Sequence, residues 1–173
     1  MLIIKKFIAL LVTAWMVANI SACDSKEDIA KSFVQKTAAS NHPPQTKTFR
    51  RKVGDLDITL TYRYKDDVVL QQVAEDITPY DLLQAKNRME AKAVMDKISA
   101  SYMQLPGVSQ KVKFLNNRAH EFLTIDFTQA SIQQLCTLKD ISIGMIITDC
   151  TVDWLTMTNV ERFLREQAFS EVK

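Results

Sequence analysis

The chain has 173 residues, with 22 Lys and Arg against 20 Asp and Glu, two His and three Cys. Hydrophobic residues make up 47% and charged residues 24%, ordinary globular values that exclude a disordered or fibrous chain. This length fits one domain. The formal net charge is +2, and its meaning for binding partners depends on which segment of the chain carries the two excess positive charges.

Residues 1–22 have the layout of a secretory signal peptide. A positive pair at residues 5–6, an apolar run over residues 7–18 and small residues at 21–22 precede Cys23. An uncleaved membrane anchor is the alternative. A spanning helix needs about 20 predominantly apolar residues, and this run is shorter.

The residues around Cys23 indicate a lipid anchor. Residues 20–23 read Ile-Ser-Ala-Cys, which resembles the lipobox of bacterial lipoproteins, with Ile20 where Leu is usual. The resemblance implies diacylglycerol on Cys23, cleavage before it, and a fatty acid such as palmitate on the new amino terminus. Two or more acyl chains make a stable anchor. A free thiol is the alternative, but a reactive exposed thiol is a liability in an oxidising compartment.

The expected location is the cell envelope, with the domain in the periplasm and the lipid in the membrane. Asp24 resembles the sorting signal that keeps lipoproteins of enteric bacteria in the inner membrane. The rule varies between bacterial groups, so sorting to the outer membrane stays open.

Removal of the signal peptide changes the charge of the chain. Residues 1–22 contain two Lys and no acid, so the mature chain has 20 basic and 20 acidic residues and no net charge. A neutral chain without a basic run has no electrostatic footprint for nucleic acid. We expect a lipidated Cys and polar tether over residues 23–47 and a single domain over residues 48–173.

The first half of the domain alternates apolar and polar residues over 56–64, which predicts a half-buried strand. A turn at residues 65–67 and a second strand over 68–75 complete a hairpin. Thr78 and Pro79 suit the start of a long helix, and Pro106-Gly107 suits its end.

The second half predicts another hairpin, with strands over 108–115 and 119–127. A short helix over 131–138, an apolar stretch over 141–147 and a last helix from Thr158 or Asn159 to about Ala168 follow. The order predicts an α+β fold: an antiparallel β-sheet built from hairpins, with one long helix and terminal helices packed on one face.

Cys136 and Cys150 remain once Cys23 is lipidated. In an oxidising compartment an even number of cysteines favours a disulfide, which would close a loop of about 15 residues and stabilise by about 3 kcal/mol. Two separate buried thiols are the alternative. The spacing gives no CxxC redox motif.

The candidates for a catalytic or metal site are few. His120 and Asp126 share a strand face but lie about 20 Å apart along a regular strand, too far for direct contact. Asp66 and Asp67 lack the further converging oxygen ligands that a cation needs. The sequence predicts no catalytic residue, metal site or cofactor.

Four segments together resemble one family. They are ITLTYRYKDDVVLQQ (58–72), LPGVSQKVKF (105–114), FLTIDF (122–127) and AFSEVK (168–173). They resemble the YehR-like family of small bacterial lipoproteins over residues 56–173. Ala168 stands where family members often have a Gly, which would end the helix in a left-handed cap. The resemblance implies an α+β lipoprotein domain and implies no activity.

The leading hypothesis is a non-enzymatic accessory or binding module, anchored to the membrane, for an unknown envelope protein or small ligand. Its partner surface would be the sheet face opposite the helices or the loops at 65–67 and 116–118. One alternative is a small envelope hydrolase centred on His120. The other is a lipid- or peptide-binding protein with an interior cavity.

Overall fold

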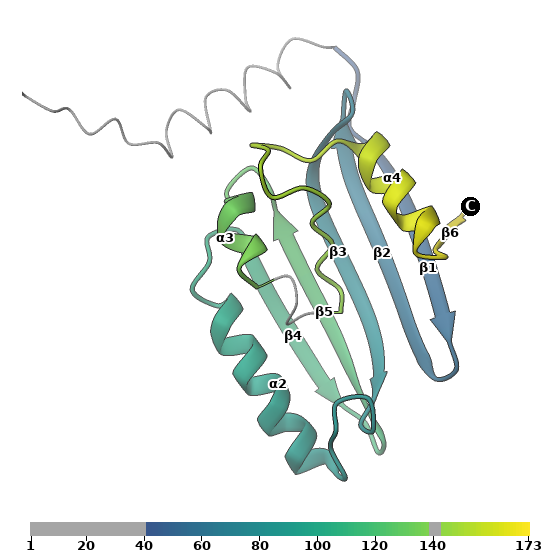
Figure 1. Ribbon diagram of the computed structural model, residues 1–173, viewed down its shortest axis with the longest axis vertical. Coiled ribbons are helices and arrows are strands. Elements are labelled where there is room, and N and C mark those ends of the chain that lie inside the picture. Colours follow the sequence, from purple (N-terminus) through teal and green to yellow (C-terminus); the bar gives the residue numbers. More distant parts are fainter. Residues whose placement is uncertain (1–40, 139–142) are drawn as a thin grey trace, which may run out of the picture.

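The alternating segments of the sequence form one antiparallel sheet in the computed structural model, which describes residues 41–138 and 143–173. Its strands are β1 (Gln45–Val53), β2 (Leu56–Lys65), β3 (Val68–Pro79), β4 (Val108–Phe114), β5 (Arg118–Asp126) and β6 (Ser170–Val172). They lie in the order β4-β5-β3-β2-β1-β6 (Figure 1). The expected α+β class with an antiparallel sheet is confirmed.

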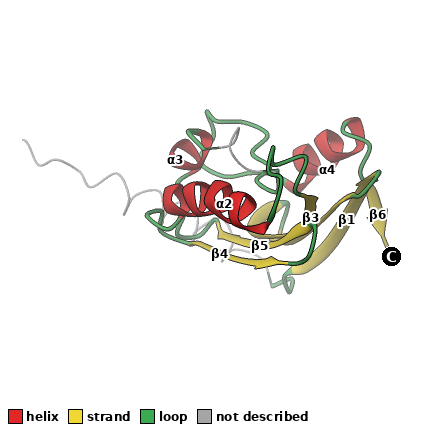
Figure 2. Ribbon diagram, turned by 90° about the horizontal axis from the view of Figure 1, so that it is seen from below, coloured by secondary structure: helices red, strands yellow, loops and turns green. Residues whose placement is uncertain are grey.

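Three helices lie over one face of this sheet: α2 (Arg88–Tyr102), α3 (Ile132–Cys136) and α4 (Met157–Glu166). Figure 2 shows the sheet edge-on, with the helices on one side of it. We call the other side, which no described helix covers, the open face. None of the described helices is long and apolar enough to cross a membrane.

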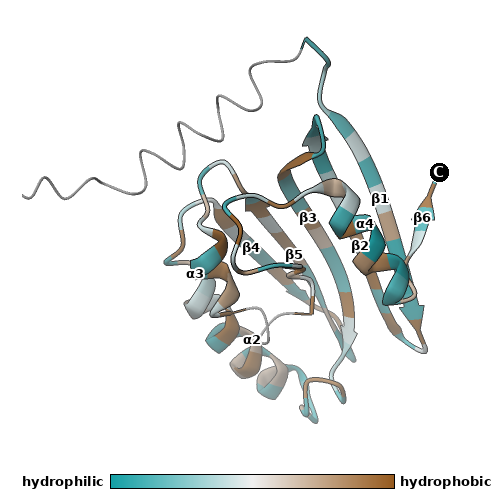
Figure 3. Ribbon diagram, turned by 45° about the horizontal axis from the view of Figure 1, so that its top comes forward, coloured by the Kyte–Doolittle hydropathy of each residue, from teal (hydrophilic) through white to brown (hydrophobic). Residues whose placement is uncertain are grey.

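The core lies between the sheet and the helices. Period-two alternation directs every second side chain of a strand toward the helices, so Leu60 and Tyr62 of β2 and Leu123 and Ile125 of β5 are fully buried. The strands in Figure 3 accordingly carry alternating hydrophilic and hydrophobic bands. Large buried side chains such as Tyr102 of α2 pack into this space, which gives no support to a ligand cavity there.

The long helix begins later than the sequence predicted. Thr78 and Pro79 do not start it, because both remain in β3, paired with β5. The helix instead begins after Asn87, whose side chain accepts hydrogen bonds from the backbone N–H groups of Met89 and Glu90. Cross-strand pairing therefore overrides a local Thr-Pro signal that also suits a helix start.

The sequence did not predict the two strands at one edge of the sheet, β1 and β6. β1 begins at Gln45, within the predicted tether, and the terminal β6 pairs with β1 over Thr48–Arg50.

Helix α4 is capped by Thr156 rather than by Thr158 or Asn159. Ala168 adopts the left-handed backbone with φ +60° where a glycine is common, and this turn leads the chain into β6.

A disulfide holds the loop between α3 and α4. Cys136, at the end of α3, is bonded to Cys150 with an S–S distance of 2.05 Å. The loop between them includes the buried Met145, which joins the core beneath the helices. Apart from residues 139–142, this loop is described without any helix or strand.

Replacing both Cys136 and Cys150 with Ala should lower the free energy of unfolding by about 3 kcal/mol, because the unfolded chain loses a constraint across 14 positions. Urea denaturation followed by circular dichroism measures this. Reducing the parent protein should reproduce the loss and leave the variant unchanged. An equal midpoint for parent and variant would contradict the prediction.

Candidate functional site

The predicted site residues fall into separate places. Cys23 and Asp24 lie outside the described residues. Cys136 and Cys150 form the disulfide. His120 lies on the open face in β5.

His120 has an acidic partner, but not the one considered from the sequence. Its Nε2 lies 2.7 Å from Oε1 of Glu75 on β3, and its ring lies 4.2 Å from that of Phe122. Asp126 instead accepts hydrogen bonds from Thr128 and Gln129 in the following turn. A hydrolytic site also needs a nucleophile beside the base. In the described chain, no hydroxyl or thiol hydrogen-bonds to the His120 ring.

The turn at residues 65–67 serves the fold. Oδ1 of Asp67 accepts hydrogen bonds from the backbone N–H and the hydroxyl of Thr158, and its carbonyl accepts one from the Met157 N–H. These bonds tie the β2–β3 turn to the first turn of α4. The Asp67 carboxylate is thus used inside the domain.

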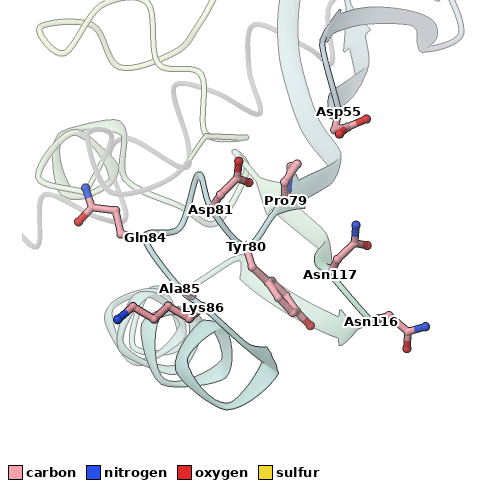
Figure 4. Close-up of a pocket in the computed structure, with 9 residues that line it drawn as sticks. All are labelled: Asp55, Pro79, Tyr80, Asp81, Gln84, Ala85, Lys86, Asn116 and Asn117. Atoms are coloured by element: carbon pink, nitrogen blue, oxygen red, sulfur yellow. The ribbon is translucent and has the colours of Figure 1, made fainter.

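Three connecting segments lie at one end of the sheet, opposite the end where the described chain begins. They are the β1–β2 turn, the segment that joins β3 to α2, and the β4–β5 turn, and we call them together the distal end (Figure 1). The described chain enters at Asn41, at the other end of β1, so the nine-residue strand separates the two by about 30 Å. Figure 4 shows the surface hollow at the distal end, of about 600 Å³.

Tyr80 fixes the geometry of this hollow. Its N–H donates to the Asn117 carbonyl at 3.0 Å, and its hydroxyl donates to the Leu115 carbonyl at 2.5 Å. The Ala85 N–H donates a hydrogen bond to the Tyr80 carbonyl at 2.8 Å and closes the loop before α2. The segment after β3 is therefore stapled to the β4–β5 turn by backbone and side-chain hydrogen bonds.

Four large apolar side chains are exposed at the distal end, and none of them lines the hollow. Val53, Leu82, Met89 and Leu115 are 54%, 55%, 78% and 49% exposed. Val53 ends β1, Leu82 and Leu115 lie in two of the three connecting segments, and Met89 lies in the first turn of α2. Several exposed large apolar side chains at one end of the domain mark a candidate interaction site.

The polar side chains of the hollow do not converge on one point. In Figure 4, Tyr80 points toward the turn at Asn116 and Asn117, whereas Gln84 and Lys86 extend to the opposite side. Within the described ranges, no group of three or more His, Cys, Asp and Glu side chains could hold a metal ion. This arrangement suits the binding of a surface better than chemistry on a small molecule.

A pair of buried acids lies beneath the helices. Asp76 on β3 is directly opposite Glu121 on β5, and the two are 0% and 6% exposed. Burial, and then the neighbouring Glu121, raise the pKa of Asp76 to about 8. Burial also raises the pKa of Glu121, although a hydrogen bond from Gln110 opposes this. The sequence offered one signal, since Glu121 alternates in phase with the core residues of its strand.

The loop before α4 packs directly on this region. The Gly144 carbonyl accepts a hydrogen bond from Nε2 of buried Gln72 at 2.5 Å. A Cβ on Gly144 would lie 2.7 Å from that of Ala74 and closer still to the Asp76 carboxylate. Only glycine fits here without a shift of Ala74, and neither carboxylate oxygen of Asp76 has a hydrogen-bond partner among the described residues.

The sequence has relatives along its whole length. A family model described as "Protein of unknown function (DUF1307)" matches residues 45–170. The chain is 27% identical to the uncharacterized lipoprotein Lin0239 of Listeria innocua, over 100% of this chain and 99% of that protein. It is 24% identical to the uncharacterized lipoprotein YehR of Escherichia coli K12, over 98% and 97%. These matches confirm the resemblance to the YehR-like family.

Two solved structures share the fold. The NMR structure of the E. coli YehR protein has a TM-score of 0.64 at 26% identity and covers 78% of this chain and 94% of that one. An NMR structure of a protein from Streptococcus pneumoniae TIGR4 has a TM-score of 0.53 at 17% identity, covering 78% and 88%. The second likeness concerns the fold alone.

Asp76→Asn should make the protein more stable at pH 8. The folded protein keeps the Asp76 proton where the unfolded chain has released it, so this acid lowers the free energy of unfolding as the pH rises from about 4 to about 8. Asn does not titrate, so the variant should exceed the parent by on the order of 5 kcal/mol at pH 8, from about four pH units at about 1.36 kcal/mol each, and approach it near pH 4.

Urea titrations at the two pH values measure this difference. Asp55→Asn is the matched control, because Asp55 is an exposed turn residue at the distal end. A gap between Asp76→Asn and the parent that does not change with pH would contradict the assignment.

Proposed function

Because this chain belongs to the DUF1307 family of proteins of unknown function, we propose that it is a membrane-anchored envelope lipoprotein that binds a protein partner through its distal end. The observation that carries the binding role is the group of exposed apolar side chains at that end. The names of its relatives, uncharacterized lipoproteins, support the lipoprotein assignment.

The anchor follows from the first residues. A signal peptide over residues 1–22 directs export, and Cys23 carries the lipid that holds the mature chain at the membrane. Asp24 favours retention in the inner membrane, with the domain in the periplasm. The domain then presents its distal end about 30 Å from the point where the tether enters it.

A protein surface suits the distal end better than a small ligand. Val53, Leu82 and Leu115 supply exposed apolar area, and Asp55, Asp81, Lys86, Asn116 and Asn117 line the neighbouring hollow with polar groups. Protein–protein interfaces combine buried apolar contacts with polar groups that form hydrogen bonds. The stapling of this end by Tyr80 keeps it preorganised, which reduces the entropy lost on binding.

A non-enzymatic role agrees with the arrangement of the titratable groups. His120 is paired with Glu75 without a neighbouring nucleophile, and Asp76 and Glu121 are buried under the helices, away from solvent. A catalytic acid or base must reach its substrate within hydrogen-bond distance. The buried acids do not meet this condition in the described chain.

A photo-crosslinking residue at Leu82 or Leu115, introduced in the living cell, should capture the same envelope protein. Met103 is the matched control, because it is also an exposed apolar residue but lies at the opposite end of α2. Adding Val53→Asp should remove the crosslink from both positions. An equal yield from Met103, or no specific product from either distal position, would overturn the proposal.

Cys23→Ser should abolish the anchor. The variant should take up no radiolabelled palmitate and should keep its signal peptide, because lipoprotein processing requires the modified cysteine. Labelling and electrophoretic mobility measure both effects. The Cys136→Ala and Cys150→Ala double variant is the control and should be labelled normally. Undiminished labelling of Cys23→Ser would contradict the anchor.

A further inference from the structure

The open face carries an excess of positive charge. The strand registers place six basic and three acidic side chains on it: Arg50, Lys52, Arg63, Lys111, Lys113 and Arg118, and Asp57, Glu75 and Asp126. The mature chain as a whole has equal numbers of bases and acids. The fold therefore separates charge, with the compensating acids elsewhere on the chain.

The acids on this face are already engaged. Asp57 accepts a bidentate ion pair from Arg50, with Nε to Oδ1 at 2.7 Å. Glu75 contacts His120, and Asp126 accepts hydrogen bonds within its own turn. Their negative charge is thus partly compensated by groups of the same domain.

Of the six bases, only Arg50 has an acidic partner among the described residues, and four of the other five are exposed. Lys52, Arg63, Lys111 and Lys113 are exposed and form no ion pair with any part of the chain that the structure describes. Lys113 lies over the Phe122 ring at 5.4 Å, which keeps its ammonium at the surface of the sheet. These side chains are available to an anionic partner.

We propose that the open face rests on the anionic lipid headgroups of the membrane that holds the anchor. Lys and Arg side chains near an anionic bilayer attract it without needing individual pairing. The face lacks the exposed large apolar anchors that dominate protein interfaces: of the exposed large hydrophobic residues that the structure describes, only Val172 lies on it. Phe122 is covered by His120 and Lys113.

The tether permits this orientation. From Cys23 to Asn41 the chain makes 18 residue-to-residue steps, which reach at most about 60 Å when extended. That exceeds the roughly 30 Å length of a strand such as β2, so the sheet can lie along the bilayer. The inference rests on the lipid anchor proposed above but not on the distal-end partner. The anchor keeps the bilayer within reach, so docking needs no encounter in solution.

The test uses the lipidated protein reconstituted into vesicles of phosphatidylcholine alone or with phosphatidylglycerol. A fluorophore is attached at Ser109→Cys on the open face or at Ala93→Cys on the exposed side of α2. The lipids carry a nitroxide quencher on their headgroups. Co-flotation of the protein with the vesicles first confirms the anchor, so a failed anchor is distinguished from a failed orientation.

The expected result is quenching at Ser109→Cys that increases with the fraction of phosphatidylglycerol, and no quenching at Ala93→Cys. The quenching should decrease in 0.5 M salt, because the Debye length of about 4 Å screens the attraction between the bases and the lipid headgroups. Lys111→Glu with Lys113→Glu should reduce the ratio of docked to free domain by roughly fivefold for each base removed, about 1 kcal/mol per base. Arg88→Glu with Lys97→Glu, the same charge change on α2, should leave it unchanged.

Equal quenching at the two label positions, or quenching that ignores both salt and phosphatidylglycerol, would overturn the proposal even if the charge-reversed variant does not fold. Capture of an acidic envelope protein by the open face, with loss of capture in the Lys111→Glu and Lys113→Glu variant and no response to phosphatidylglycerol, would also overturn it and assign the face to that protein.

Discussion

The pairing of β3 with β2 on one side and β5 on the other is the constraint on which the rest of the structure depends. This strand is the longest in the sheet, and both its neighbours pair with it along most of its length. At one end, the turn before it gives Asp67 to the start of α4. At the other end, Pro79 leads into Tyr80, which fixes the distal end. The core, the last helix and the candidate binding surface are positioned from this strand.

The same pairing brings Asp76 and Glu121 together inside the domain. Burial without a cationic partner disfavours the charged form of an acid, and this raises the pKa of Asp76. The loop at Gly144 covers this place with backbone rather than with a side chain, and Gln72 holds that backbone by a hydrogen bond. The pair thus relates the stability of the fold to pH, and both acids are buried among the residues that the structure describes.

The two proposed surfaces differ in the physics of their contacts. The distal end offers exposed apolar area on a preorganised set of turns, which suits a specific protein partner. The open face offers unpaired bases on a rigid sheet, which suits a charged surface that needs no fixed register. A lipid anchor and the segment between Cys23 and Asn41 would allow both contacts together, since the distal end lies at the ends of the strands and not on the open face.

Local patterns in the sequence determined the two hairpins, the presence of a long helix between them and the α+β class, because such patterns act within one segment. They also determined the candidate lipidation site at Cys23. Only the tertiary structure decided that Thr78 and Pro79 stay in β3, because partners on β5 some 40 residues away hold them there. The strand registers likewise set the pairing of Asp76 with Glu121 and the basic excess of the open face, since a neutral composition carries no information about which charges share a face.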